Sequence, residues 1–231
     1  MAKPRLPLLP IDENDTLIPP ALHRIWVGGK PPAWVRASWE RQDRFFAQSA
    51  HDWWIVTYTD GNMPRPLAKA AEVADFYGLP PRGKADLMRV VAVSLWGGFY
   101  LDADVVPLRS LDDLVRNPEV RVWTTSHAES REQQVLWNGG FAAHPHSAYM
   151  ADILAFAQRK LERGVTNEHF LAGPRAYRSF LPAYAVTEWD FQFEASSEER
   201  RTMASGGEFD LDALRAKYPA RLKHIGPKED Q

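Results

Sequence analysis

The segment from Lys84 to Pro107 constrains this chain more than any other part of its sequence, because it predicts a helix, an abrupt stop and a buried strand in succession. Apolar residues recur at helical spacing as far as Trp96, and two consecutive glycines then end the pattern. The apolar and aromatic run 99–101 follows directly and predicts a buried strand.

Two carboxylates, Asp102 and Asp104, stand at the end of this strand. Side chains two residues apart in a strand project to the same side, so the two charges repel each other unless a cation lies between them. Hard divalent cations favour such oxygen ligands. A protein that holds one in a cleft often uses it on a phosphate. The pattern therefore predicts a metal site that binds a phosphate-bearing ligand.

The helix before the strand carries one acid and one base, Asp86 and Arg89, on a surface that is apolar nearly all round. Burying an unpaired charge is strongly unfavourable, so each side chain needs a partner. Two alternatives follow from the residues alone. The pair forms a structural i, i+3 ion pair, or it contacts a polar ligand.

The rest of the chain alternates strand and helix patterns, which predicts an α/β fold with a mainly parallel central sheet flanked by helices. Its 231 residues suit one domain over 1–231, with residues 1–17 as a proline-rich lead-in. We expect strands at 22–27, 53–58, 120–126, 135–143 and 185–193, and helices at 32–48, 66–77, 147–163, 167–184 (interrupted at Gly173) and 211–217.

Composition excludes several classes of protein. The absence of cysteine excludes disulfides, thiolate metal sites and cysteine nucleophiles. A net charge of -2 without a basic run argues against nucleic acid as a partner. No apolar stretch approaches the length of a membrane span, and the N-terminus lacks a signal-peptide pattern, so we expect a cytoplasmic protein.

Two blocks of sequence resemble a known family, the glycosyltransferases whose sugar-binding region contains a DXD motif. The first is the run from Ala85 to Val105, with Asp86, Arg89 and the Asp102–Asp104 pair. The second is the run from Ile18 to Gly29, which is similar to the family's opening strand. The family includes initiating mannosyltransferases, capsular sugar transferases and clostridial glucosylating toxins. The resemblance implies the GT-A fold.

The resemblance also implies a reaction, the transfer of a hexose from a nucleotide-sugar such as a UDP- or GDP-sugar, with retention of configuration and with Mn²⁺ or Mg²⁺ as cofactor. The acceptor, whether a glycan, a lipid-linked sugar or a protein, stays open. The catalytic set would be Asp86, Arg89, Asp102 and Asp104. The residues implied in substrate binding are Trp26, Asn62, Asp86, Arg89, Tyr100, Asp102 and Asn138.

Within that set the resemblance assigns separate roles. Trp26 would stack on the base, and Asp86 and Arg89 would hold the donor sugar. Asp102 and Asp104 would bind the metal. His224 would be a third metal ligand, with Lys223 or Lys228 near the diphosphate.

Two rival interpretations remain at this point. A haloacid dehalogenase-type phosphatase also carries Asp-x-Asp after an apolar strand, but normally after the first strand, whereas Asp102 lies mid-chain. A non-catalytic module that binds a sugar nucleotide would share the fold and lack turnover.

Overall fold

The computed structural model describes residues 3–7, 11–12, 14, 16–130, 133–167, 171–180, 187–192 and 195–226. Its centre is an eight-stranded sheet in the order β2-β1-β3-β6-β5-β7-β8-β4. The strands are β1 Ala21–Trp26, β2 Trp54–Thr59, β3 Gly98–Leu101, β4 Val105–Pro107, β5 Val122–Ser130, β6 Gln133–Ala143, β7 Thr187–Gln192 and β8 Leu222–His224.

The sheet is mixed, with parallel pairings for β1–β2, β1–β3, β5–β7 and β7–β8 and antiparallel pairings for β3–β6, β5–β6 and β4–β8. Parallel pairs therefore predominate, as the sequence predicted. Because β1, β2 and β3 run parallel, their carboxyl ends meet at one edge, where ligands bind in open α/β sheets. Trp26 and Asp102 lie at this edge.

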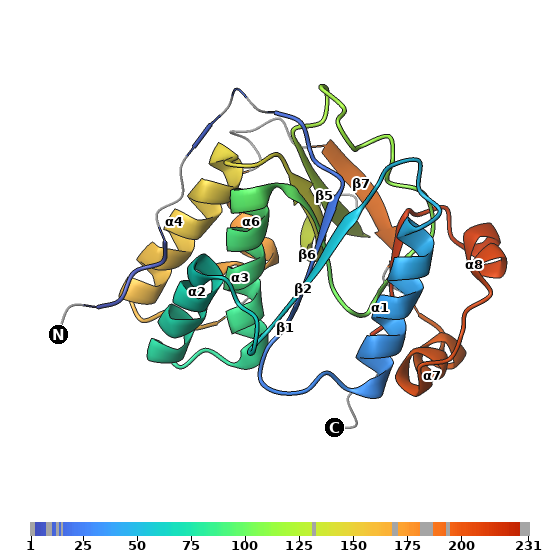
Figure 1. The fold of residues 1–231 in the computed structure, drawn as a ribbon, viewed down its shortest axis with the longest axis horizontal. Coiled ribbons are helices and arrows are strands. Elements are labelled where there is room, and N and C mark those ends of the chain that lie inside the picture. Colours follow the sequence, from blue (N-terminus) through green and yellow to red (C-terminus); the bar gives the residue numbers. More distant parts are fainter. Residues whose placement is uncertain are drawn as a thin grey trace.

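Helices cover both faces of the sheet. Figure 1 shows α2, α3, α4 and α6 gathered on one side of the strands and α1, α7 and α8 on the other. Their bounds are α1 Ala33–Phe46, α2 Arg65–Phe76, α3 Pro81–Trp96, α4 Ala148–Glu162, α6 Pro174–Phe180, α7 Ser197–Ser205 and α8 Leu211–Lys217. No helix in the part of the chain that the structure describes is long and apolar enough to cross a membrane.

Strand β3 separates two apolar cores because its side chains alternate between the faces. Tyr100 packs with α3, α4 and α6 in the larger core. Phe99 and Leu101 face the other way and pack with Phe46 of α1 and Trp123 of β5. All four residues of β3 are buried, which confirms the buried strand that the sequence predicted.

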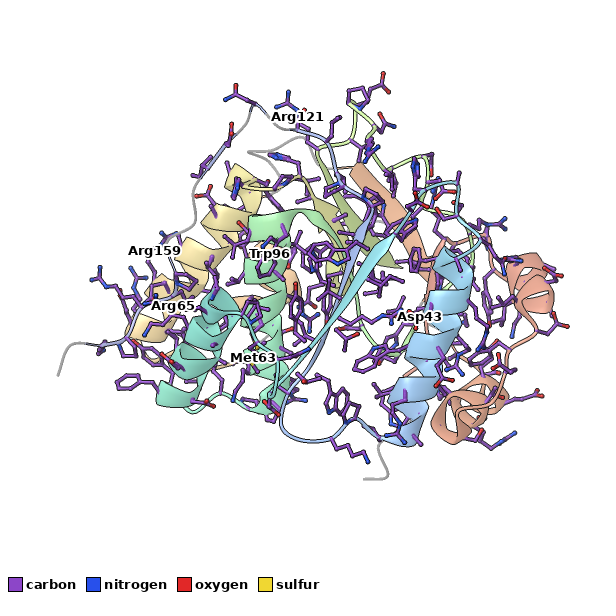
Figure 2. All side chains as sticks on the ribbon, in the orientation of Figure 1. Asp43, Met63, Arg65, Trp96, Arg121 and Arg159 are labelled. Atoms are coloured by element: carbon purple, nitrogen blue, oxygen red, sulfur yellow. The ribbon has the colours of Figure 1, made fainter. Side chains whose placement is uncertain are left out.

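Helix α1 is tied to the sheet by a charge pair as well as by packing. Arg24 of β1 is 3% exposed at its side chain, and its Nη2 lies 2.8 Å from Oδ1 of Asp43. Figure 2 shows Asp43 on α1. The pair fixes the helix whose buried face backs the Asp102–Asp104 turn.

Three elements were not predicted from the sequence, namely β4, α7 and β8. Both strands span only three residues, too few to show a period of two. Helix α7, with the sequence SEERRTMAS, is polar around most of its surface. Of the expected helix at 167–184, residues 174–180 form α6 and residue 167 is not helical, while residues 168–170 and 181–186 lie outside the described residues.

The double glycine between α3 and β3 meets two demands of backbone geometry. Gly97 and Gly98 both have positive φ, at 64° and 91°. A Cβ at position 98 would also lie 2.5 Å from the carbonyl oxygen of Ala21. The absence of a side chain lets the chain turn out of the helix and enter the sheet directly beside β1.

This geometry predicts that Gly98→Ala destabilises the protein more than Gly164→Ala. Gly164 also has positive φ, 79°, but a Cβ there would meet nothing within 4 Å. The control should lose about 1–2 kcal/mol of unfolding free energy from the left-handed backbone alone, and Gly98→Ala should lose clearly more. Urea denaturation measures both. Equal losses of unfolding free energy in the two variants would show that the close contact with Ala21 does not affect stability.

Candidate active site

A buried cation, the guanidinium of Arg89, lies at the centre of the candidate site. Its Nη2 is 2.6 Å from Oδ1 of Asp86, and its Nη1 is 3.2 Å from Oδ1 of Asp102. Its Nη1 also donates to the carbonyl of Asn138 at 2.6 Å, and its Cζ lies over the Tyr100 ring, 4.5 Å from the ring centre. Burial lowers the pKa of Arg89, but the carboxylates of Asp102 and Asp86 outweigh it and the net pKa is raised.

The structure shows the ion-pair alternative for Asp86 and Arg89, and the contact with a polar ligand stays a prediction. The i, i+3 ion pair is formed, and Arg89 also reaches beyond it to Asp102. Asn138 completes the network, since its Nδ2 donates to Oδ1 of Asp86 at 3.0 Å and to the carbonyl of Ala172 at 3.2 Å. One cation thus joins α3, β3 and β6. The proposed roles of these residues toward a sugar stay predictions.

Asp102 is held by its neighbours before any ligand arrives. Its Oδ1 accepts a 2.7 Å hydrogen bond from Tyr100 Oη, and its backbone N–H donates to the carbonyl of Gly139 at 2.7 Å. Burial raises the pKa of Asp102, the charge of Arg89 opposes that rise, and the charge of Asp104 adds to it. The carboxyl group is therefore oriented, with a cation on one side and a second carboxylate on the other.

Asp104 meets His224 although 120 positions separate them in the chain. Nε2 of His224 lies 2.9 Å from Oδ2 of Asp104. Strand β8 pairs with β4 so that His224 stands opposite Val105, and the N–H of Ile225 donates to the carbonyl of Asp104 at 2.8 Å. Burial lowers the pKa of His224, and the carboxylates of Asp104 and Asp102 raise it, with a net rise.

This corner fits a divalent metal by its donor chemistry. Asp104 offers carboxylate oxygen, which suits Mn²⁺ or Mg²⁺, and His224 offers imidazole nitrogen, which suits transition ions. Among the residues that the structure describes, no group of three or more His, Asp or Glu side chains gathers as a metal cluster. Asp102 is turned toward Arg89 and Tyr100. Asp104 and His224 are therefore the direct candidates, with Asp102 beside them.

A cavity of about 850 Å³ opens over these residues. Six of the predicted site residues line it, namely Trp26, Arg89, Tyr100, Asp102, Asp104 and His224. Trp26 lines it together with Trp34, whose ring is edge-on to that of Trp26, at 6.4 Å between centroids and 86° between planes. The cavity therefore has an aromatic wall of two tryptophans and the Asp104–His224 pair among its lining residues.

Three predicted residues do not line this cavity, namely Asn62, Asp86 and Asn138. Asn62 closes the turn after β2, where its Oδ1 accepts from the N–H of Thr59 at 2.6 Å and its Nδ2 donates to the carbonyl of Thr57 at 2.8 Å. The neighbouring Asp60 accepts from the N–H groups of Gly28 and Gly29, both at 3.0 Å. This turn therefore fixes the loop after Trp26, and the nucleotide contact of Asn62 stays a prediction.

Two residues that the sequence analysis missed also belong to the site, Gln42 and Arg200. Gln42, on α1, is fully buried, and its Nε2 donates to the carbonyls of Asp102 at 3.2 Å and Val105 at 3.0 Å. It holds the turn that carries Asp102 and Asp104 from behind. The sequence did carry a signal, because Gln42 occupies the buried stripe of α1 with Val35 and Phe46. Arg200, on α7, lines the cavity.

Comparison with known proteins adds a family to this geometry. Residues 38–121 match the family model described as a glycosyltransferase sugar-binding region containing a DXD motif. The match covers α3 and the Asp102–Asp104 turn. No curated protein sequence was found to match the chain.

Solved structures with a similar fold are glycosyltransferase domains. The structure described as PaToxG glycosyltransferase is 15% identical over 73% of this chain and 70% of that chain, with a TM-score of 0.54. The UDP-bound glycosyltransferase domain of the YGT toxin is 8% identical over 75% and 80%, with a TM-score of 0.50. At such identities the likeness shows the fold, and the expected GT-A architecture is confirmed.

The contacts of Gln42 predict an order of stability among three variants. Gln42→Met removes the donor at nearly constant length. The buried carbonyl of Val105 loses this hydrogen bond, and the carbonyl of Asp102 keeps the N–H of Val105 at 3.1 Å, so the free energy of unfolding should fall by about 1–3 kcal/mol. Gln42→Glu should be worse, because it sets a carboxylate against carbonyl oxygens. Ser38→Ala, one turn earlier on the same face, is the control, since its hydroxyl is buried without a partner in the described part of the chain. Denaturant unfolding that placed Gln42→Met level with Ser38→Ala would contradict the role of Gln42.

Proposed function

The protein carries the DXD-containing sugar-binding region and the GT-A fold of a glycosyltransferase, and from this premise we propose that it transfers a sugar from a nucleotide-sugar donor with the help of a divalent metal. One observation supports this above the others. Asp104 and His224, distant in sequence, meet at a cavity that Trp26 also lines. Metal ligands and an aromatic platform in one cavity suit a ligand with both a diphosphate and a base.

Each side of the cavity has its own part in the proposal. Trp26 stacks on the base, and the loop fixed by Asp60 keeps that ring in place. Arg89 and Tyr100 hold Oδ1 of Asp102, so that its other carboxylate oxygen serves the ribose and the metal. Asp104 and His224 hold the metal. When bound, the metal would neutralise charge that grows on the diphosphate leaving group.

The donor sugar would lie near Arg89, the member of the ion pair that lines the cavity. Asp86 is 8% exposed and directs its Oδ1 to Arg89 and Asn138, so it acts chiefly by keeping Arg89 and Asn138 in place. In this proposal the whole chain acts as one glycosyltransferase domain. Retention of anomeric configuration is carried over from the family resemblance, and the anomer of the released product tests it.

For the donor we propose only a class of compound, the UDP- and GDP-sugars. The YGT toxin domain, which has this fold, was solved with UDP bound, and this supports testing UDP-sugars first. The phosphatase alternative finds no support in the fold or the family match. Turnover of a nucleotide-sugar would distinguish the proposed enzyme from a non-catalytic module that only binds it.

The central prediction of this proposal is metal-dependent donor hydrolysis. With a panel of UDP- and GDP-sugars and Mn²⁺, at least one donor should be hydrolysed, and EDTA should stop the reaction until metal is restored. Asp104→Asn should lower the rate about 100-fold or more, because the metal supplies several kcal/mol of charge stabilisation. Donor hydrolysis at the same rate in EDTA would contradict the proposed dependence on a metal. Tight nucleotide binding with no turnover of any donor or acceptor would favour the non-catalytic module.

The aromatic wall gives a separate prediction. Trp26→Ala should weaken UDP binding roughly tenfold or more, because stacking of a base on an aromatic ring contributes about 1–3 kcal/mol. Trp54→Ala is the matched control, since Trp54 is 58% exposed at the start of the edge strand β2 and does not line the cavity. Titration calorimetry compares the two variants. UDP affinity that was unchanged in a folded Trp26→Ala protein would remove the base platform from the proposal.

A further inference from the structure

We propose that Arg200 on α7 is the cation that binds the diphosphate of the nucleotide-sugar. The inference rests on the proposed function and adds to it a ligand contact that the sequence analysis did not assign. Arg200 is half-buried and lines the same cavity as Trp26 and the Asp104–His224 pair.

The position of Arg200 is fixed by its contact with the loop after β8. Its Nη1 donates to the carbonyl of Gly226 at 3.0 Å. Gly226 lies directly against the candidate metal ligands, since a Cβ there would be 2.9 Å from Cε1 of His224 and 3.5 Å from Oδ2 of Asp104. The guanidinium is thus attached to the chain segment that borders the Asp104–His224 pair, where a metal-bound diphosphate would lie.

A diphosphate in this cavity needs a cation besides the metal. Asp102 and Asp104 both line the cavity, and their carboxylates repel an anionic ligand. The positively charged side chains among the lining residues are Arg82, Arg89, Arg200 and His224 in its protonated form. An arginine matches phosphate oxygens in geometry as well as in charge, because its planar N–H groups bind two oxygens at once.

Among these arginines, Arg200 is the one that has N–H donors left for a phosphate and lies next to the Asp104–His224 pair. Arg89 is 7% exposed and is shared by Asp86, Asp102 and the carbonyl of Asn138. Arg82, in the first turn of α3, is exposed and has another interaction, whereas Arg200 is half-buried and bonded to the loop beside the Asp104–His224 pair. Arg200 has five N–H donors, and its bond to Gly226 uses one of them.

The lysine that the sequence analysis placed near the diphosphate is directed elsewhere. Lys223 is fully buried and does not line the cavity. Its Nζ lies 3.5 Å from Oε2 of Glu199 and 3.4 Å from the centre of the Tyr218 ring. The expectation for Lys223 is therefore wrong, because β8 turns this side chain away from His224 and into the protein. Lys228 lies outside the described residues.

The same Glu199 anchors the helix that carries Arg200. Ser196 and Glu199 form a capping box at the start of α7. Glu199 also accepts from Tyr218 at 3.0 Å and pairs with Lys217 at 3.2 Å. Glu199 is buried while the next residue, Arg200, reaches the cavity. The helix thus presents Arg200 from a fixed backbone, which reduces the entropy that a flexible arm would lose on binding.

The test compares each nucleoside diphosphate with its own nucleoside. UDP against uridine, and GDP against guanosine, are titrated by calorimetry in the presence of Mn²⁺. Arg200→Met should weaken the preferred diphosphate about ten- to hundredfold, as expected for a lost charged hydrogen bond. Its affinity for the nucleoside should stay unchanged. Arg200→Gln removes the charge but keeps an N–H donor for Gly226, so it should show the same loss if Arg200→Met proves too unstable.

Arg201→Met is the matched control, because it makes the same charge change on the next, exposed residue of α7. It should bind both ligands like the unaltered protein. A folded Arg200 variant with unaltered affinity for the diphosphate would overturn the role of Arg200 but not the proposed function. An equal loss of diphosphate affinity in Arg201→Met would do the same. Failure of the unaltered protein to bind UDP or GDP would overturn the proposed function, and the role of Arg200 with it.

Discussion

The site depends on one guanidinium, that of Arg89, which compensates two carboxylates in the protein interior. Without it, Asp86 and Asp102 would be stranded in surroundings where an unpaired charge is strongly unfavourable. The guanidinium also orients both acids, since it contacts Asp86 one turn earlier on α3 and Asp102 directly after β3. Replacing Asp86 and Arg89 together by apolar residues would therefore still leave Asp102 without its cation, so the pair cannot be treated as an isolated unit.

The remainder of the site is assembled around this core from parts of the chain that are far apart. Helix α1 supports the Asp102–Asp104 turn through Gln42, β1 ends in Trp26, and β8 brings His224 to Asp104. The C-terminal segment is therefore part of the site. Its hold on the turn is a strand pairing of three residues, a backbone bond from Ile225 and the anchored helix α7. Changes in Glu199 or Lys223 are expected to act on the site through this segment.

The sequence predicted those parts of the site where pattern and chemistry coincide locally. The helix, the double glycine and the Asp102–Asp104 strand end lie within 24 consecutive positions, and each leaves a mark on a short window. Arg200 leaves no such mark, and Gln42 shows only its place in the buried stripe of α1. The partners of both are backbone carbonyls far away in the chain, those of Gly226, Asp102 and Val105. The Ser196–Glu199 pair did carry a capping signature, but no apolar run followed it to indicate a helix. Asn62 is the opposite case. The sequence showed its turn, but its hydrogen bonds, to Thr59 and Thr57, lie within that turn and give it no link to the cavity.

The central claim, a metal-bound nucleotide in the cavity between Trp26 and His224, is tested most directly by diffraction from crystals grown with Mn²⁺ and UDP. The account predicts one anomalous manganese peak between the side chains of Asp104 and His224, in place of their present hydrogen bond. It also predicts the uracil ring against Trp26. Bound UDP with the Asp104–His224 hydrogen bond intact and the manganese elsewhere would contradict it.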